Sequence, residues 1–107
     1  MKFDILTLFP EVIDAVLGSS IIGRAIENGI ISVESHNIRD YTKDKHKKTD
    51  DTPYGGGKGM LMSTQPICDC FEAVKGKLPD GRTKVIYASP RGRIFNHEIA
   101  KELSQYD

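Results

Sequence analysis

The chain has 107 residues, 38% hydrophobic and 28% charged, and its 15 basic and 15 acidic residues give a formal net charge of zero. Its apolar runs are too short to span a bilayer, and its first residues, MKFDILTLFP, lack the order of a signal peptide, so we expect a cytoplasmic globular protein. Zero net charge argues against a protein that binds nucleic acid over its whole surface.

The first 38 residues predict two strands separated by two helices. Residues 3–9 are rich in apolar, β-compatible types and predict a buried strand. A short helix follows over residues 10–17, since proline is tolerated in a first turn. A serine cap before Ile21 begins a second helix, which residues 28–29 end in a left-handed conformation. Residues 30–38 alternate well enough for a second strand.

The second half of the chain predicts two more helices and a third strand. Residues 39–62 show no sustained period, which is unusual inside a domain and normally functional. A helix then begins after Ser63, with Ile67, Phe71 and Val74 on one face. Residues 84–89, KVIYAS, predict a third strand, and Asn96 predicts the cap of a last helix.

Strands separated by helices predict an α/β domain with a mostly parallel sheet and flanking helices. In such an alternating pattern a further strand would follow the last helix, and three strands are few for a sheet covered on both faces. We therefore expect residues 1–107 to form a single partial α/β domain, truncated at its C-terminal side.

The two cysteines predict neither a disulfide nor a metal site. Cys68 and Cys70 lie two residues apart on a predicted helix, so their side chains point in different directions. No other cysteine is available as a metal ligand. We expect free thiols, buried or half-buried, and no bound metal.

A local basic segment lies between Arg39 and Lys48, where five cations face two aspartates around His46. One hypothesis is that Lys45, Lys47 and Lys48 hold phosphates while His46 and Asp50 position a base or assist proton transfer. The alternative is a solvated charged loop, which the spacing alone favours. A further alternative is a non-catalytic RNA-binding α/β module that uses residues 39–48.

A glycine-rich segment follows at DDTPYGGGKGMLM, residues 50–62. Such a loop can turn sharply, admit a ligand close to the backbone or present amide groups to an anion. It does not match a phosphate-binding P-loop or a dinucleotide-binding GxGxxG pattern. By composition alone a flexible turn is the commoner outcome. Its glycines are Gly55, Gly56, Gly57 and Gly59.

A third candidate site lies at the end of the predicted third strand. In open α/β sheets, ligands bind outside the carboxyl ends of the strands. Pro90 and Gly92 would let the loop fold over a flat ligand such as an adenine ring, beside Tyr87 and Ser89. An ordinary strand-ending turn has equal weight. Arg24, on the second predicted helix, either contacts a phosphate or is simply solvated.

Taken together, these blocks resemble the bacterial TrmD-type tRNA (guanine-N1)-methyltransferases of the SPOUT superfamily. The resemblance runs from Phe3 to about Leu103, and the DDxPYGGGxGM block is highly specific. The matching blocks are Phe9-Pro10-Glu11, Gly23-Arg24-Ala25, Arg39-Asp40-Tyr41, Asp44-Lys45-His46-Lys47, Asp50-Asp51-x-Pro53-Tyr54-Gly55-Gly56-Gly57-x-Gly59-Met60 and Ser89-Pro90-x-Gly92.

The resemblance implies a SPOUT domain whose C-terminal part forms a trefoil knot, with the knot segments absent from this chain. It implies methyl transfer from S-adenosylmethionine to guanine N1 of the nucleotide immediately 3′ to the tRNA anticodon. It further implies a homodimer with tRNA as partner, no membrane association, and a magnesium requirement in the full enzyme. The chain alone is expected to be inactive, because the general base and the later cofactor loops lie outside it.

The resemblance also assigns roles to residues of this chain. Asp50 and His46 take supporting catalytic roles. One wall of the cofactor pocket is assigned to Tyr87, Ser89, Pro90 and Gly92. The residues assigned to tRNA binding are Arg24, Lys45, His46, Lys47, Gly55, Gly56, Gly57 and Gly59.

Overall fold

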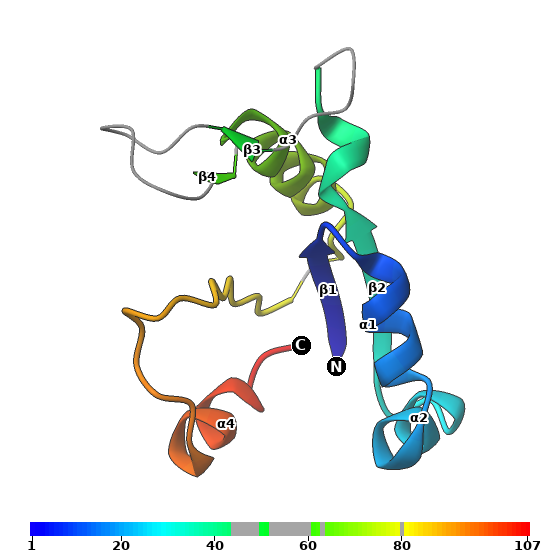
Figure 1. The fold of residues 1–107 in the computed structure, drawn as a ribbon. Coiled ribbons are helices and arrows are strands. Elements are labelled where there is room, and N and C mark those ends of the chain that lie inside the picture. The colour runs from blue at the N-terminus through cyan, green and yellow to red at the C-terminus, as the bar shows by residue number, and fades with distance from the viewer. Residues whose placement is uncertain (44–49, 52–60, 63, 80) are drawn as a thin grey trace. The chain divides into compact units, whose positions relative to one another are not determined.

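The computed structural model describes residues 1–43, 50–51, 61–62, 64–79 and 81–107, with residues 50–51 and 61–62 described by their backbone alone (Figure 1). It divides into two compact units, Lys2–Leu78 and Pro79–Asp107 together with Met1. In chain order the elements are β1 (Lys2–Thr7), α1 (Pro10–Leu17), α2 (Ser20–Glu27), β2 (Ser32–Asn37), the 3-10 helix η1 (Ile38–Tyr41), β3 (Asp50–Asp51), β4 (Leu61–Met62), α3 (Thr64–Lys75) and α4 (His97–Leu103).

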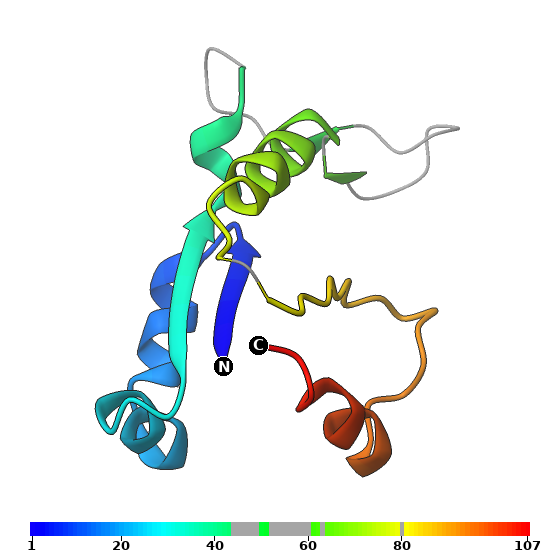
Figure 2. The ribbon, with the colours of Figure 1, turned by 180° about the vertical axis from the view of Figure 1, so that it is seen from behind.

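A parallel pair of strands, β1 and β2, forms the frame of the first unit (Figures 1 and 2). Their register runs from Lys2 opposite Ser32 to Thr7 opposite Asn37. The connection between them consists of α1 and α2, as parallel strands require a crossover of this kind. The predicted strand, two helices and parallel second strand are confirmed.

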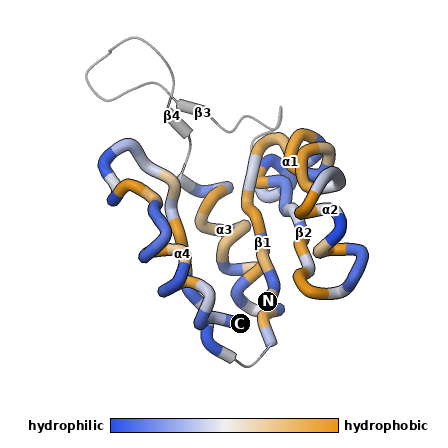
Figure 3. Tube along the Cα trace, turned by 90° about the horizontal axis from the view of Figure 1, so that it is seen from below, coloured by the Kyte–Doolittle hydropathy of each residue, from blue (hydrophilic) through white to orange (hydrophobic). Residues whose placement is uncertain are grey.

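The helices α1 and α3 lie on opposite faces of this sheet, because successive side chains of a strand alternate between faces. On one face, the Ser35 hydroxyl donates to Asp14 of α1 at 2.9 Å. On the other, Leu6 packs against the cluster of buried residues that α3 helps to form. Apolar residues dominate β1 and α1 in Figure 3.

The core of the described residues joins α3 to η1 and the end of β1. Ile38, Cys70 and Val74 are buried, with exposed fractions of 5%, 0% and 7%. Ile67 packs against them, as its predicted place on the apolar face of this helix requires. Half-buried Leu6, Leu8 and Tyr41 complete the cluster. Both cysteines are free thiols, as predicted. Cys70 is buried, but the prediction of a buried or half-buried thiol is wrong for Cys68, which is exposed.

Two of the predicted helix-end signals, at Gly29 and Asn96, are confirmed by the backbone and a side-chain hydrogen bond. Gly29 adopts a φ of +72° after α2, the left-handed conformation that glycine favours. The Asn96 side chain accepts a hydrogen bond from the Ile99 amide at 2.9 Å and so caps α4. The prediction that a serine side chain caps α2 is wrong. Ser19 precedes the helix, but its hydroxyl accepts no hydrogen bond from a helix amide and donates to the Val16 carbonyl.

The predicted third strand at residues 84–89 is wrong for this chain. These residues form no strand, and Val85, Ile86 and Tyr87 are 64%, 66% and 86% exposed. A strand requires a neighbour to accept its backbone hydrogen bonds, and the described residues supply none to residues 85–88.

The second unit is closed by its own ends. The Arg82 amide donates to the Asp107 carboxylate at 2.7 Å, and the Asp107 amide donates to the Arg82 carbonyl at 2.8 Å. Lys84 lies over the ring of Tyr106, 5.8 Å from its centroid. None of the helices that the structure describes, in either unit, is long and apolar enough to cross a membrane. The prediction of one domain over residues 1–107 stays a prediction.

Candidate functional site

Arg24 is the one predicted tRNA contact whose side chain lies among the described residues. It stands in the middle of α2 and is exposed to solvent. No described carboxylate lies within ion-pair distance of its guanidinium. An exposed guanidinium without a carboxylate partner presents its donors to solvent, and these donors match the geometry of a phosphate.

Asp50 lies in β3, where its backbone pairs with Met62 of β4 in an antiparallel ladder. These two short strands are the first and last residues of the glycine-rich segment, residues 50–62, so the backbone of Asp50 lies beside that of Met62. The other residues predicted here, Lys45, His46, Lys47, Gly55, Gly56, Gly57 and Gly59, lie outside the described residues.

Of the four residues predicted for the cofactor, Ser89, Pro90 and Gly92 form one turn of the second unit, and Tyr87 lies just before it. The Gly92 amide donates to the Ser89 carbonyl at 3.1 Å, and the Arg91 amide donates to the Ser89 hydroxyl at 3.2 Å. A β-carbon at position 92 would stand 3.4 Å from the Ser89 carbonyl, so the turn is tight. Tyr87 projects before the turn with most of its side chain exposed.

A shallow hollow of about 410 Å³ lies on the same unit, beside α4. The side chains that line it include none of the four residues of the predicted cofactor turn. The four residues therefore share one loop but do not line this hollow. The hollow is lined by Arg93, Ile94, Asn96, Glu98, Ile99 and Glu102.

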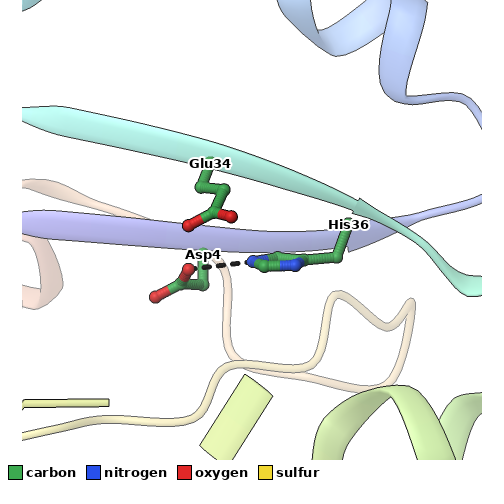
Figure 4. A group of neighbouring side chains, drawn as sticks. All are labelled: Asp4, Glu34 and His36. Atoms are coloured by element: carbon green, nitrogen blue, oxygen red, sulfur yellow. Dashed lines mark hydrogen bonds and ion pairs between the residues drawn. The ribbon is translucent and has the colours of Figure 1, made fainter. Parts of the chain in front are cut away.

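A cluster of charged side chains that the sequence analysis did not single out lies on the paired strands (Figure 4). His36 Nε2 donates to Asp4 Oδ1 at 2.9 Å, and Glu34 stands directly opposite Asp4 in the ladder. Potential ligand atoms of these three residues lie within 4.8 Å of one another. Alternation along the second predicted strand puts Glu34 and His36 on one face, but only the register of the two strands places Asp4 beside them.

Lys2 accounts for this cluster without a metal ion. Its ammonium lies 3.5 Å from a carboxylate oxygen of both Asp4 and Glu34. Two like charges opposite each other on adjacent strands repel, and a cation between them removes that repulsion. The cluster is thus a network of ion pairs and one hydrogen bond on the sheet, and the absence of a metal site in this chain stays a prediction.

Cys70 is a core residue and not a nucleophile. Burial, and secondly the negative charge of Asp40, raise the pKa of its thiol above the ordinary value. A raised pKa keeps the group as a thiol at neutral pH, and the thiolate is the reactive form.

Comparison with known proteins gives matches over the whole chain. The model of the tRNA (Guanine-1)-methyltransferase TrmD family matches residues 1–107. The tRNA (guanine-N(1)-)-methyltransferase of Ruminiclostridium cellulolyticum is 53% identical over 107 residues, which are 100% of this chain and 46% of that protein. The protein of the same name from Clostridium perfringens strain SM101 is 59% identical over 105 residues, covering 98% of this chain and 43% of that protein.

Solved structures agree with these sequence matches. The chain superposes on the crystal structure of the tRNA (m1G37) methyltransferase from Aquifex aeolicus with a TM-score of 0.78 at 27% identity. The superposition covers 98% of this chain and 46% of that one. The chain therefore spans less than half the length of the relatives that it matches.

Proposed function

The chain belongs to the tRNA (Guanine-1)-methyltransferase TrmD family, and from that premise we propose that it is the N-terminal part of an enzyme that methylates guanine N1 in tRNA. The methyl donor is S-adenosylmethionine, and the target is the nucleotide immediately 3′ to the anticodon. The α/β fold described above is that part of a SPOUT methyltransferase domain which precedes the knot. The match of the family model to all 107 residues carries this proposal.

The residues of the predicted cofactor turn fit one side of a nucleoside. Tyr87 offers an exposed aromatic ring, on which a base can stack. Tyr87, Ser89, Pro90 and Gly92 would hold S-adenosylmethionine, whose sulfonium supplies the methyl group.

Removal of one proton is the chemical problem that the protein has to solve. Guanine N1 carries a proton that must leave as the methyl group arrives, so a carboxylate base has to stand beside a base that is turned out of the RNA stack. The family resemblance assigns that base to an aspartate outside this chain. Asp50 and His46 support it by orienting the guanine. In the sequence they lie at and just before the glycine-rich segment, whose glycines suit the close approach of a flat base to the backbone.

Cations of the first unit hold the RNA. Arg24, Lys45 and Lys47 neutralise phosphates around the target, and Gly55, Gly56, Gly57 and Gly59 admit the backbone or the base at close range. The enzyme acts as a homodimer on cytoplasmic tRNA, with magnesium serving the full enzyme. No finding favours the alternative, a non-catalytic RNA-binding module.

Transfer of a labelled methyl group tests the proposal. The complete enzyme is incubated with labelled S-adenosylmethionine and a tRNA that carries guanosine 3′ to the anticodon, and the product nucleoside is identified. We expect 1-methylguanosine, and none with a matched tRNA that carries adenosine at that position. Tight tRNA binding with steep salt dependence and no methylation would instead support the non-catalytic module.

Titration calorimetry tests the cofactor assignment separately. Because the turn at residues 87–92 forms only one wall, we expect the 107-residue chain to bind S-adenosylmethionine weakly or not at all. Equal affinities of the 107-residue chain and of the complete enzyme for S-adenosylmethionine would contradict the proposal that other segments of the complete enzyme form the rest of the cofactor pocket.

A further inference from the structure

The connection between α1 and α2 contains the most constrained backbone of the first unit. We call Gly18, Ser19, Ser20 and the first turn of α2 the elbow. The Gly18 amide donates to the Asp14 carbonyl at 3.0 Å and ends α1. Two residues later Ser20 adopts a φ of +60°, and no other non-glycine residue of the described segments has a positive φ. Such a conformation is strained for serine and persists only where the surroundings impose it.

Gly23 is what allows the two helices to meet this closely. It is the buried residue of α2, and its amide donates to the Ser19 carbonyl at 3.0 Å. A β-carbon at this position would lie 2.9 Å from both the carbonyl carbon and the carbonyl oxygen of Gly18. Since both are backbone atoms, no side chain can rotate away to make room. Any larger residue at position 23 must move α2 away from the end of α1.

Arg24 takes its direction from this contact. Successive residues of a helix are turned by about 100° around its axis, so the burial of Gly23 against the elbow turns its neighbour outward. Arg24 is accordingly exposed, with no described carboxylate within ion-pair distance. The aim of the guanidinium is therefore set by how α2 sits on the elbow.

We propose that Gly23 is a positioning residue for tRNA binding, which acts by holding α2 against Gly18 so that Arg24 faces an RNA phosphate. The strained backbone of Ser20 contributes to the same positioning, because it sets the angle at which α2 leaves the turn. This inference rests on the proposed contact of Arg24 with tRNA.

The test measures tRNA affinity of the complete enzyme at several salt concentrations, beside methyl transfer at saturating tRNA. Arg24→Ala is expected to weaken binding on the order of 10-fold and to reduce the slope of log K against log salt by about 0.7 to 0.9, which is the loss of one phosphate contact. Arg24→Ala with unchanged affinity would overturn the inference. Methylation by that same variant would leave the proposed function standing, so the two failures are distinguishable.

Gly23→Ala is expected to reproduce the loss of affinity and slope while leaving methyl transfer at saturating tRNA within about twofold. In the Arg24→Ala background it should weaken binding no further, because the contact through which it acts is already gone. The matched control is Gly76→Ala after α3, where the new β-carbon meets its nearest neighbour among the described residues, the Glu72 carbonyl oxygen, at an ordinary 3.5 Å. Additive effects of Gly23→Ala and Arg24→Ala would show a general structural role and overturn the proposal.

Ser20→Val tests the same proposal if Gly23→Ala does not fold. A β-branched residue resists a positive φ, and position 20 is exposed, so the change disturbs the elbow without a core clash. Its control is Ser19→Val, at a neighbouring exposed position with an extended φ of −129° that valine accepts. We expect Ser20→Val to weaken tRNA binding through Arg24, and Ser19→Val to bind like the parent. Equal affinities of the two variants would overturn the proposal.

Discussion

Two segments of this chain have the same sequence pattern and different structures. Residues 3–9 and residues 84–89 are both short runs of apolar, β-compatible residues that end at a proline. The first forms β1, which is paired with β2 along six residues. The second is unpaired, and Val85, Ile86 and Tyr87 are mostly exposed. An apolar run thus becomes a strand only where a neighbouring backbone accepts its hydrogen bonds.

The units that contain these segments differ in the same way. Lys2–Leu78 has a parallel sheet and a small buried core. Pro79–Asp107 has a capped helix and joined ends, yet Ile94 and Phe95 are 87% and 69% exposed. Large apolar side chains such as Val16, Ile21 and Ile30 are exposed on the first unit as well, so the difference between the units lies in the sheet and the buried core. We expect the first unit to carry its own stability, and the second to gain its strand from segments outside this chain.

The largest effect is expected from Asp50→Ala, which should lower methyl transfer strongly and the free energy of unfolding very little. Asp50→Ala removes a carboxylate from a strand of two residues, so it should cost at most about 1 kcal/mol of unfolding free energy. If Asp50 orients the guanine, methyl transfer should fall on the order of 10²-fold or more. Single-turnover methylation at saturating tRNA, beside a thermal melt, measures both quantities.

His46→Ala should behave in the same way, with a large loss of methyl transfer and a small change in melting temperature. If the activity of Asp50→Ala or His46→Ala falls only in proportion to its melting temperature, these residues belong to an ordinary charged loop without a role in the chemistry. Unchanged turnover of either variant would lead to the same conclusion.

A pair of valines sharpens the comparison of the two units. Val74 is 7% exposed and Val85 is 64% exposed. In the 107-residue chain, Val74→Ala should cost about 1.5 to 3 kcal/mol, and Val85→Ala less than about 0.5 kcal/mol. In the complete enzyme the cost of Val85→Ala should approach that of Val74→Ala. Urea unfolding of both variants, in the short chain and in the complete enzyme and beside each parent, measures these costs. Equal losses of unfolding free energy from Val74→Ala and Val85→Ala in the short chain would contradict the difference between the two units.

The smallest effect is expected from a phosphate contact in the basic segment. Lys47→Ala should weaken tRNA binding several-fold and flatten its salt dependence by about one phosphate contact, with methyl transfer at saturating tRNA unchanged. Binding titrations at three or more salt concentrations measure it. A variant that loses turnover but keeps its affinity would move Lys47 from RNA binding to the chemistry.

Local signals predicted most of the first unit. Proline at the start of α1, glycine after α2 and alternation in β2 are short-range features, and the structure confirms each. The fold class followed from the order of these elements. The η1 turn and the two-residue strands β3 and β4 were not predicted, because residues 39–62 carry no period and a strand of two residues is too short to show alternation.

The site was predictable to a smaller degree. The turn at Ser89–Gly92 followed from proline and glycine, and its hydrogen bonds agree. The Asp4, Glu34 and His36 cluster was missed because it needs the register of two strands, which no single segment contains. The role of Gly23 depends on a close approach to Gly18, and sequence alone shows only a glycine inside a helix.

Amide hydrogen exchange of residues 84–88 tests the central contrast most directly. The measurement is made on the 107-residue chain and on the complete enzyme, with the amides of β1 as the internal reference. We predict protected β1 amides in both proteins, and amides of residues 84–88 that exchange freely in the short chain but are protected in the complete enzyme. Protection of residues 84–88 in the short chain, or free exchange in both proteins, would contradict the account.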